Sequence, residues 1–274
     1  MPVHSIPDGF IDVHAHIAPT SFLKEVHKFG KSFGVDIDET ESGHALTFPS
    51  LPTLRAAGGS LSDTVTRSEW MEEQGIGSQY MAAWLDIQGY TLPQDKEADW
   101  VRLLNEHMAQ TADESGEAFR SIAAVPLRDG DRAARELEYA VKTLGMLGVM
   151  LPSDPADVDV ADPVLEPFWA AAEALDVPVM LHGASHSKWP QVGPSFLAFS
   201  MGRTLDTTIL AAKLIHSGLM DRHPNLKLIL CHGGGSLPFL IGRLDVAYRL
   251  GMEKMADLNR GGPEEYLSLI HISE

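Results

Sequence analysis

Short apolar runs alternate with amphipathic segments along most of the chain. The first run, FIDVHAH at residues 10–16, follows the turn pair Asp8-Gly9. Five further runs occupy residues 76–84, 120–127, 148–152, 177–182 and 226–232. Several are apolar almost throughout, which is typical of strands covered on both faces. The pattern predicts parallel strands joined by crossover helices.

The segments between these runs predict the helices. Helical patterns are expected at about residues 20–29, 62–74, 94–115, 131–145, 161–175 and 204–220. Ser62 or Asp63 is the expected N-cap of the second helix, because both residue types accept from the first free backbone N–H groups. Residues 31–61 are rich in Gly, Pro and Ser, so we interpret them as an insertion without regular structure.

Repeated strand-helix units indicate an α/β fold, and we predict a (β/α)₈ TIM barrel rather than an open nucleotide-binding sheet. Neither GxGxxG nor GxxxxGK[ST] follows any run, and the HGGG at residues 232–235 lacks phosphate-loop spacing. No low-complexity tract or linker interrupts the pattern. A single domain over residues 1–274 is therefore expected.

Composition narrows the classes of partner. Hydrophobic residues make up 44% of the 274 positions, enough for a sizeable core. The chain has 21 basic and 38 acidic side chains, which give a formal net charge of −17. An acidic surface repels phosphate backbones and anionic lipid, so we expect no nucleic-acid or membrane partner and a small-molecule ligand instead.

The single cysteine and the N-terminal sequence favour a cytoplasmic location. Because Cys231 is the single cysteine of the sequence, an intramolecular disulfide and a cysteine-rich zinc module are both excluded, which fits a reducing compartment. We interpret Cys231 as a small buried core residue rather than a nucleophile. No run of about 18 apolar residues is present, and the first ten residues lack a basic start or an apolar signal segment.

The chain has twelve histidines, and four of them end apolar runs. His14 and His16 lie two apart, and the period of a strand points both rings to the same side. By itself this pair also fits two solvated loop histidines. His182 and His232, however, end the fifth and sixth runs, where barrel enzymes place catalytic groups. A metal ion held by three of the four, with the fourth moving protons, accounts for all four positions.

The other histidines receive no role. Six of them fall in expected helices or exposed loops, where solvation suffices: His4, His27, His44, His107, His216 and His223. His186 and Trp189 follow the fifth run, where they either line a pocket or lie on a surface loop.

Four segments together resemble a known family. They are IDVHAH, VPVMLH, the block GRTLDTTILAAKLIHSGLMDRHPNLKLILCHGGGSLPFLIGRLD and the later GGPEEYL. This set is similar to the amidohydrolase superfamily, and within it to the metal-dependent decarboxylases typified by aminocarboxymuconate-semialdehyde decarboxylase and γ-resorcylate decarboxylase. The resemblance covers about residues 9–266. It implies a barrel of the metal-dependent hydrolase type that removes carbon dioxide, without redox chemistry, from a small unsaturated or aromatic carboxylic acid.

The resemblance also implies roles for individual residues. His14, His16 and His182 would bind one divalent metal ion, usually zinc and in some members manganese, and His232 would be the acid/base. Arg243 would bind substrate carboxylate in a neighbouring subunit, which implies a homodimer. Arg55 would be a second carboxylate-binding arginine. From the residues alone, Arg243 also fits a surface ion pair, and Arg55 fits either interpretation.

The chain departs from the family pattern in two places. His182-Gly183-Ala184 stands where the muconate-semialdehyde enzymes have HPW, so the substrate pocket must differ. A final metal-binding aspartate, expected after a further strand, has no counterpart before the chain stops. Residues 268–274, SLIHISE, resemble a translated sequencing adapter. We therefore expect a truncated gene product, with the last strand-helix units missing, a non-native tail and little catalytic competence.

Two alternatives to decarboxylation stay open. One is a metal-dependent hydrolase or hydratase of a small carboxylated substrate on the same barrel. The other is a non-catalytic metal-binding barrel, because a fold does not establish an activity.

Overall fold

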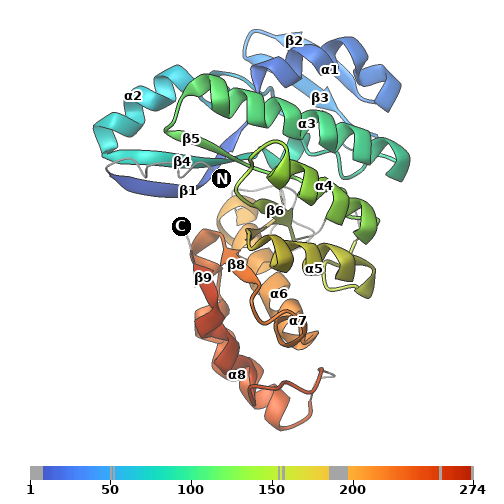
Figure 1. The fold of residues 1–274 in the computed structure, drawn as a ribbon, viewed down its shortest axis with the longest axis vertical. Coiled ribbons are helices and arrows are strands. Elements are labelled where there is room, and N and C mark those ends of the chain that lie inside the picture. The colour runs from blue at the N-terminus through green and yellow to red at the C-terminus, as the bar shows by residue number, and fades with distance from the viewer. Residues whose placement is uncertain are drawn as a thin grey trace. The chain divides into compact units, whose positions relative to one another are not determined.

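The computed structural model describes residues 9–49, 51, 53–153, 155, 158–184, 197–252 and 255–272. The chain divides into two compact units, coloured from blue to red along the sequence in Figure 1. The first unit holds Met1–Pro126 and Tyr139–Leu147, and the second holds Leu127–Glu138 and Gly148–Glu274. The prediction of one domain over the whole chain stays a prediction, and the units are described separately.

The first unit is built on a three-stranded parallel sheet. Its strands, in the order β1-β4-β5, are β1 (Phe10–Ile17), β4 (Ile76–Ala83) and β5 (Phe119–Ile122). All three coincide with apolar runs of the sequence. The helices of this unit are α1 (Thr20–Phe33), α2 (Thr64–Gln74) and α3 (Gln94–Ser115), with short 3₁₀ turns η1 (Gly59–Leu61) and η2 (Leu85–Ile87).

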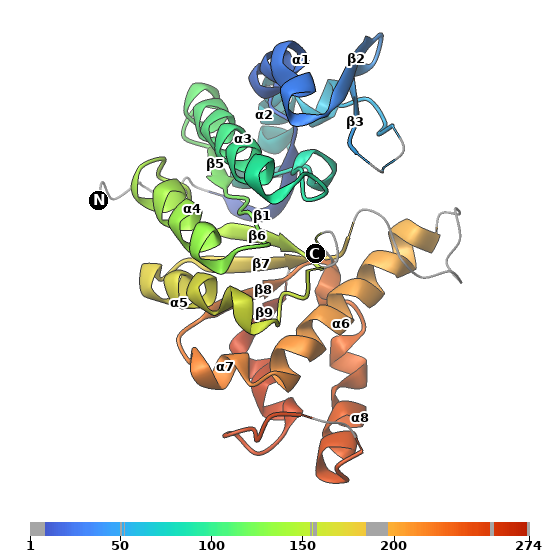
Figure 2. The same cartoon turned by 90° about the vertical axis from the view of Figure 1, so that its right-hand side faces the viewer.

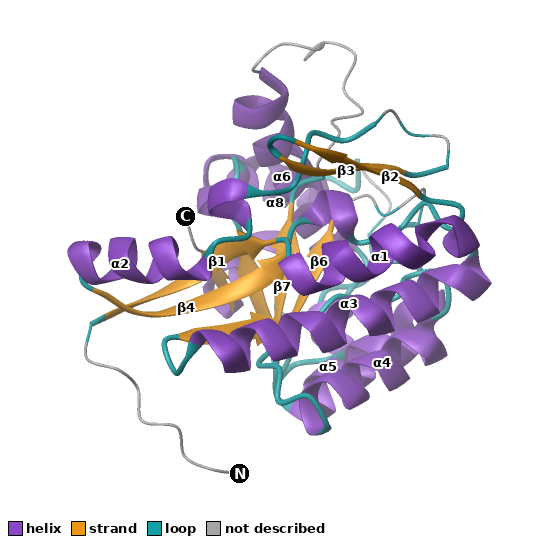
Figure 3. Cartoon of the chain, turned by 90° about the horizontal axis from the view of Figure 1, so that it is seen from above, coloured by secondary structure: helices purple, strands orange, loops and turns teal. Residues whose placement is uncertain are grey.

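The helix predictions hold closely in this unit. α3 spans the expected residues, and it packs against α1 and β5 (Figure 3). Of the two expected N-caps for α2, Asp63 is the one used: its carboxylate accepts from the backbone N–H groups of Val65 at 3.0 Å and Thr66 at 3.1 Å. The cap therefore begins the helix where the sequence predicted.

The expectation that residues 31–61 lack regular structure is wrong, because the segment contains a β-hairpin. Strands β2 (Asp36–Thr40) and β3 (Gly43–Thr47) pair antiparallel across a two-residue loop. Ile37 lies opposite the fully buried Leu46, so the hairpin has an apolar face that the polar composition of the segment obscured. Gly43 is required here, because a Cβ would lie 2.0 Å from the Ala57 carbonyl oxygen.

The second unit is built on a four-stranded parallel sheet, with its strands side by side in Figure 2. In sheet order they are β6 (Val149–Pro152), β7 (Pro178–His182), β8 (Lys227–Leu230) and β9 (Ile270–Ile272). The first three coincide with predicted runs. β9 lies within residues 268–274, whose non-native origin stays a prediction.

Helices and short turns surround this sheet. The helices are α4 (Gly130–Lys142), whose last turn belongs to the first unit, α5 (Glu166–Leu175), α6 (Arg203–His216), α7 (Leu219–Arg222) and α8 (Leu237–Arg249). The turns are η3 (Pro163–Leu165), η4 (Ala198–Gly202, π-helical), η5 (His232–Gly234) and η6 (Pro263–Leu269).

The helix expected over residues 204–220 is in fact two. α6 ends at His216 and α7 begins at Leu219, and Gly218 between them has a left-handed backbone with φ 68°. A left-handed residue cannot continue a right-handed helix, and glycine adopts that conformation at no steric cost. In the described part of the chain, no helix is both long enough and apolar enough to cross a membrane.

Candidate metal centre

In the first unit, the carboxyl end of β1 carries His14 and His16. Both are half-buried, and their rings meet edge to face with centroids 5.3 Å apart. The prediction that the two imidazoles point to the same side of the strand is confirmed. One strand thus places two imidazole rings side by side.

A β-bulge precedes these histidines. The pairing advances three residues along β1, from Asp12 to Ala15, but two along β4, from Gln79 to Met81. One oxygen of the Asp12 carboxylate accepts from the backbone N–H of His14 at 3.0 Å. The other accepts from the Gln79 side-chain amide at 2.7 Å. The bulge is therefore tied to the neighbouring strand through side chains.

Arg55 lies against Trp84, the residue directly after β4. The guanidinium carbon of Arg55 is 4.9 Å from the centroid of the Trp84 ring, which is 4% exposed. Arg55 itself is exposed. Stacking uses the flat face of a guanidinium and leaves its N–H edges for a planar acceptor such as carboxylate. This geometry is compatible with the predicted role of Arg55, which stays a prediction.

In the second unit, His182 is the last residue of β7 and is 1% exposed. Its Nδ1 lies 2.6 Å from the Gly183 carbonyl oxygen. A carbonyl only accepts, so Nδ1 carries the proton and Nε2 carries the lone pair of the neutral ring. That tautomer is the one with which a histidine binds a metal through Nε2.

His232 follows β8 and adopts a left-handed backbone, with φ 56°. This conformation is uncommon for a residue with a side chain and is found where the surrounding structure imposes it. The following glycines turn the chain against α6: a Cβ on Gly235 would lie 2.2 Å from the Thr204 carbonyl oxygen. Cys231 is fully buried beside them, in keeping with a core role.

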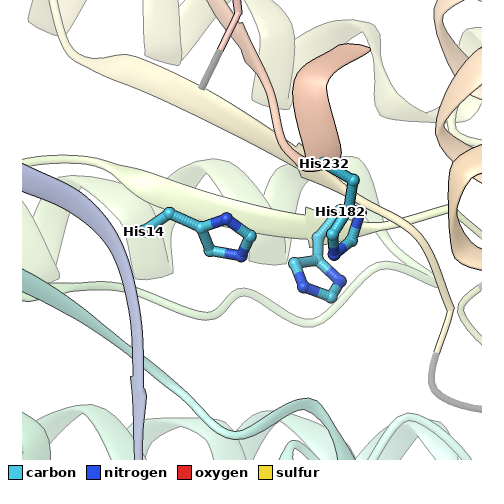
Figure 4. A group of neighbouring side chains, drawn as sticks. All are labelled: His14, His182 and His232. Carbon is cyan, nitrogen blue, oxygen red and sulfur yellow. The ribbon is translucent and has the colours of Figure 1, made fainter. Parts of the chain in front are cut away.

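The rings of His182 and His232 meet edge to face, with centroids 4.4 Å apart (Figure 4). One ring nitrogen of each lies within 4.8 Å of the other. The Thr207 hydroxyl donates to the Arg203 carbonyl at 2.9 Å, so at 3.4 Å from His232 Nδ1 it accepts. The second unit therefore brings together two histidines that lie fifty residues apart in the sequence.

Arg243 lies on α8, where its side chain is exposed. Two apolar residues of α8 and its C-cap share the face of Arg243 at helical spacing: Phe239, Val246 and Leu250, which are 91%, 54% and 68% exposed. The predicted role of Arg243 in a partner subunit stays a prediction.

Sequence reasoning missed Trp84 and Thr207, which contact the predicted site residues Arg55 and His232, and Gln79, which contacts Asp12 on the strand of His14. Trp84 is the last residue of the predicted run over residues 76–84, and Thr207 lies in the block that carries the family resemblance, so position was a usable signal for both. Gln79 gave no signal, since it is one polar residue inside an apolar run. His186 and Trp189 lie outside the described residues.

Two histidines expected to be solvated have partners instead. His107 lies 2.9 Å from Ser21 and 2.8 Å from Glu25. His223 is 7% exposed and contacts Glu173 and Glu166 at 3.1 and 2.9 Å. His107 connects α3 to α1, and His223 connects the end of α7 to α5, so both are structural residues that the sequence did not identify.

A family model described as amidohydrolase matches residues 11–260. The chain belongs to the amidohydrolase family. The match includes His14, His16, His182 and His232, and it ends inside the second unit. Membership in the family confirms the resemblance inferred from the sequence segments.

Curated relatives are similar over different shares of the chain. A 2-amino-3-carboxymuconate-6-semialdehyde decarboxylase of Dictyostelium discoideum is 26% identical over 96% of this chain and 75% of its own length. A γ-resorcylate decarboxylase of Rhodococcus jostii is 33% identical over 55% of this chain and 50% of its own. A 2-keto-4-carboxy-3-hexenedioate hydratase of Sphingobium is 30% identical over 53% of this chain and 43% of its own. The chain thus spans only part of each relative.

Solved structures share the fold of this amidohydrolase. A dihydroxybenzoic acid decarboxylase of Polaromonas, solved with manganese and the inhibitor 2-nitroresorcinol, superposes with a TM-score of 0.74 at 23% identity. The superposition covers 97% of this chain and 78% of that one. The fold class predicted from the sequence, a (β/α)₈ barrel of the metal-dependent hydrolase type, is confirmed.

Proposed function

We propose that this amidohydrolase is a metal-dependent, non-oxidative carboxy-lyase acting on a small unsaturated or aromatic carboxylic acid. The observation that carries the proposal is the contact of His182 with His232 at the carboxyl ends of adjacent strands. Catalytic groups of barrel enzymes lie at that end. The decarboxylases among the relatives supply the reaction class.

The donor set fits a divalent ion. Nδ1 of His182 donates a hydrogen bond to the Gly183 carbonyl, which leaves the lone pair of Nε2 for a metal ion. We propose His14, His16 and His182 as the ligands; the first two lie in the carboxyl-terminal half of β1 and the third ends β7. Zinc is the proposed ion and manganese the alternative, since both accept imidazole nitrogen. When bound, the ion would orient the substrate and stabilise negative charge that develops on it.

His232 is the proposed proton donor. As the carbon–carbon bond to the carboxylate breaks, carbon dioxide leaves and the electron pair stays on the substrate carbon. A proton from Nε2 of protonated His232 forms the new carbon–hydrogen bond. Thr207 holds Nδ1 of His232 and so keeps the ring in one orientation.

Arg55 and Arg243 are the proposed substrate-binding residues. A guanidinium binds a carboxylate through two parallel N–H groups. Arg243 would act in the active site of a partner chain, and the apolar face of α8 that carries Phe239, Val246 and Leu250 would be covered in a homodimer. The net charge of −17 and the single buried Cys231 support a cytoplasmic enzyme with a small-molecule substrate and no nucleic-acid or membrane partner.

A second candidate is addition of water to an unsaturated acid at the same site. The similarity to a hydratase favours it over simple hydrolysis. A non-catalytic metal-binding barrel is the remaining candidate.

Product analysis tests these candidates. The chain, loaded with Zn²⁺ or Mn²⁺, is incubated with carboxyl-labelled hydroxybenzoates and unsaturated dicarboxylates in ¹⁸O-water. Labelled carbon dioxide released above the metal-free level is the expected result. Incorporation of ¹⁸O without carbon dioxide would establish hydration, and absence of both with metal bound would favour the non-catalytic alternative.

A further inference from the structure

A chain of side-chain hydrogen bonds runs from α2 to the backbone of His14, within the first unit. The Arg67 guanidinium donates to the Ser60 carbonyl at 2.8 Å and to the Gln79 side-chain oxygen at 3.0 Å. The Gln79 amide donates to Asp12 at 2.7 Å, and Asp12 accepts from the His14 N–H at 3.0 Å. We call Arg67, Gln79 and Asp12 the Asp12 relay.

The relay acts at the bulge that sets where His14 points. Side chains on a strand alternate between faces, so one extra residue reverses which face the following side chains take. Asp12 lies on the face of β1 that Ala15 also takes, because their partners Gln79 and Met81 are two residues apart on β4. The bulge puts His14 and His16 on the other face. Bulges next to active sites commonly re-aim side chains in this way.

A bulge disrupts the ladder locally, and side chains supply acceptors for backbone N–H groups there. The N–H of His14 donates to the Asp12 carboxylate in this way. The Asp12 carboxylate is in turn held by Gln79, which is 3% exposed. Burial lowers the pKa of Arg67, and the charges of Asp12 and Asp63 oppose this shift, so the guanidinium stays cationic. Each link of the Asp12 relay therefore pairs one donor with one acceptor.

We propose that Gln79 and Arg67 are positioning residues for the metal ligand His14, acting through Asp12 on the bulge. This inference rests on the proposed metal site. Groups that orient a ligand typically contribute 10- to 100-fold to metal affinity. We expect about a 10-fold loss when the relay is broken, because it acts on the ligand's backbone rather than on its ring.

A reciprocal swap tests the proposal. Gln79→Glu sets a carboxylate against Asp12, and Asp12→Asn sets an amide donor against the Gln79 amide, so each single variant breaks the relay. The double variant restores it: the asparagine oxygen accepts from His14, its amide donates to the new glutamate, and that glutamate accepts from Arg67. Total charge equals that of the original pair. Gln74→Glu and Asp38→Asn, both at exposed positions, make the same charge changes elsewhere.

The measurements are the Kd for Zn²⁺, by competition with a chromogenic chelator well below the unfolding temperature, and the Tm of the metal-free protein. We expect each single variant to bind Zn²⁺ about 10-fold more weakly and the double variant to return to within about threefold of the original. The two control variants should bind as the original does. A purely structural relay would lower the Tm of the metal-free protein and leave the Kd of the folded protein unchanged.

Arg67→Lys is the milder variant if a single substitution in β1 or β4 prevents folding. A lysine keeps the charge but reaches only one of the two acceptors, so a smaller loss of affinity is expected. Unchanged Kd values in the folded single variants, or no recovery in the double variant, would overturn the proposal. An original chain that binds neither Zn²⁺ nor Mn²⁺ would overturn the metal site and the relay together. A chain that binds metal and passes the swap test, but releases no carbon dioxide, would overturn the decarboxylase alone.

Discussion

His182 and His232 lie in edge-to-face contact, 4.4 Å between ring centroids, yet their hydrogen bonds differ. His182 gives its Nδ1 proton to a backbone carbonyl, a fixed acceptor. His232 meets a threonine hydroxyl at the longer distance of 3.4 Å. The first arrangement suits a metal ligand held in one tautomer, and the second suits a ring that gains and loses a proton.

Substitution of the two histidines should therefore have different effects. His182→Asn is expected to lose the metal, and His232→Asn to keep it while losing about 10²- to 10⁴-fold in turnover. Metal content by atomic absorption and turnover by released carbon dioxide measure the two effects. His27→Asn, at an exposed position, is the control. Stoichiometric loss of metal from His232→Asn would instead make His232 a ligand.

Thr207→Val should reduce turnover without removing metal. The valine has the shape of threonine but cannot accept from Nδ1 of His232, so the ring loses its orientation. A single hydrogen bond of this kind contributes about 2- to 10-fold. Thr207→Ser keeps the hydroxyl and should retain activity. Equal pH–rate profiles for the valine variant and the original chain would show that Thr207 has no part in proton transfer.

Arg55 and Trp84 should affect substrate binding more than turnover. Arg55→Lys loses the two-point contact with carboxylate and is expected to raise KM about 10-fold or more. Trp84→Leu removes the ring on which Arg55 stacks, for a smaller rise of about two- to fivefold. Trp84→Phe keeps an aromatic face, so its KM should lie between those of the original chain and Trp84→Leu. A change in kcat at constant KM would mean that Arg55 does not hold the substrate.

The apolar face of α8 should control oligomeric state. Phe239→Asp places a charge where the side chain is 91% exposed, so it should shift a dimer to monomer with little cost to the folded chain. Sedimentation velocity measures the shift. In mixed dimers of inactive Arg243→Ala and inactive His232→Asn chains, one working site should reappear. If mixing restores nothing, Arg243 serves its own chain or only the surface.

Ionisation of Tyr266 is expected to lower the free energy of unfolding at alkaline pH. Burial raises its pKa to about 12, and its hydrogen bond to Asp221 at 2.7 Å contributes in the same direction. Because the unfolded phenol ionises near pH 10, the folded state holds the proton more tightly. Its stabilisation is complete below about pH 10 and is lost as the pH rises from there towards about 12. Tyr266→Phe should flatten this decline in urea-unfolding midpoints, and an unchanged decline would show that another group causes it.

Periodicity along the chain was enough to locate six of the strands and most helices. A strand that is buried on both faces appears in the sequence as a continuous apolar run. A helix appears as a 3.6-residue period wherever the helix is long enough, as in α3. The same reasoning failed for β2 and β3, since five-residue strands in a polar segment carry too little pattern. It also passed over the break at Gly218, where one left-handed glycine divides an otherwise continuous helical pattern.

The sequence by itself determined the residue types near the strand ends: His14 and His16 lie in the second half of the first apolar run, and His182 and His232 are the last residues of two later runs. Only the tertiary structure decided how those rings are held. Thr207 reaches His232 across 25 residues, and Gln79 reaches Asp12 across 67. Such contacts depend on the packing of a helix on a strand and on a one-residue bulge. Local patterns carry no information about either, because each is settled by atoms far apart in the chain.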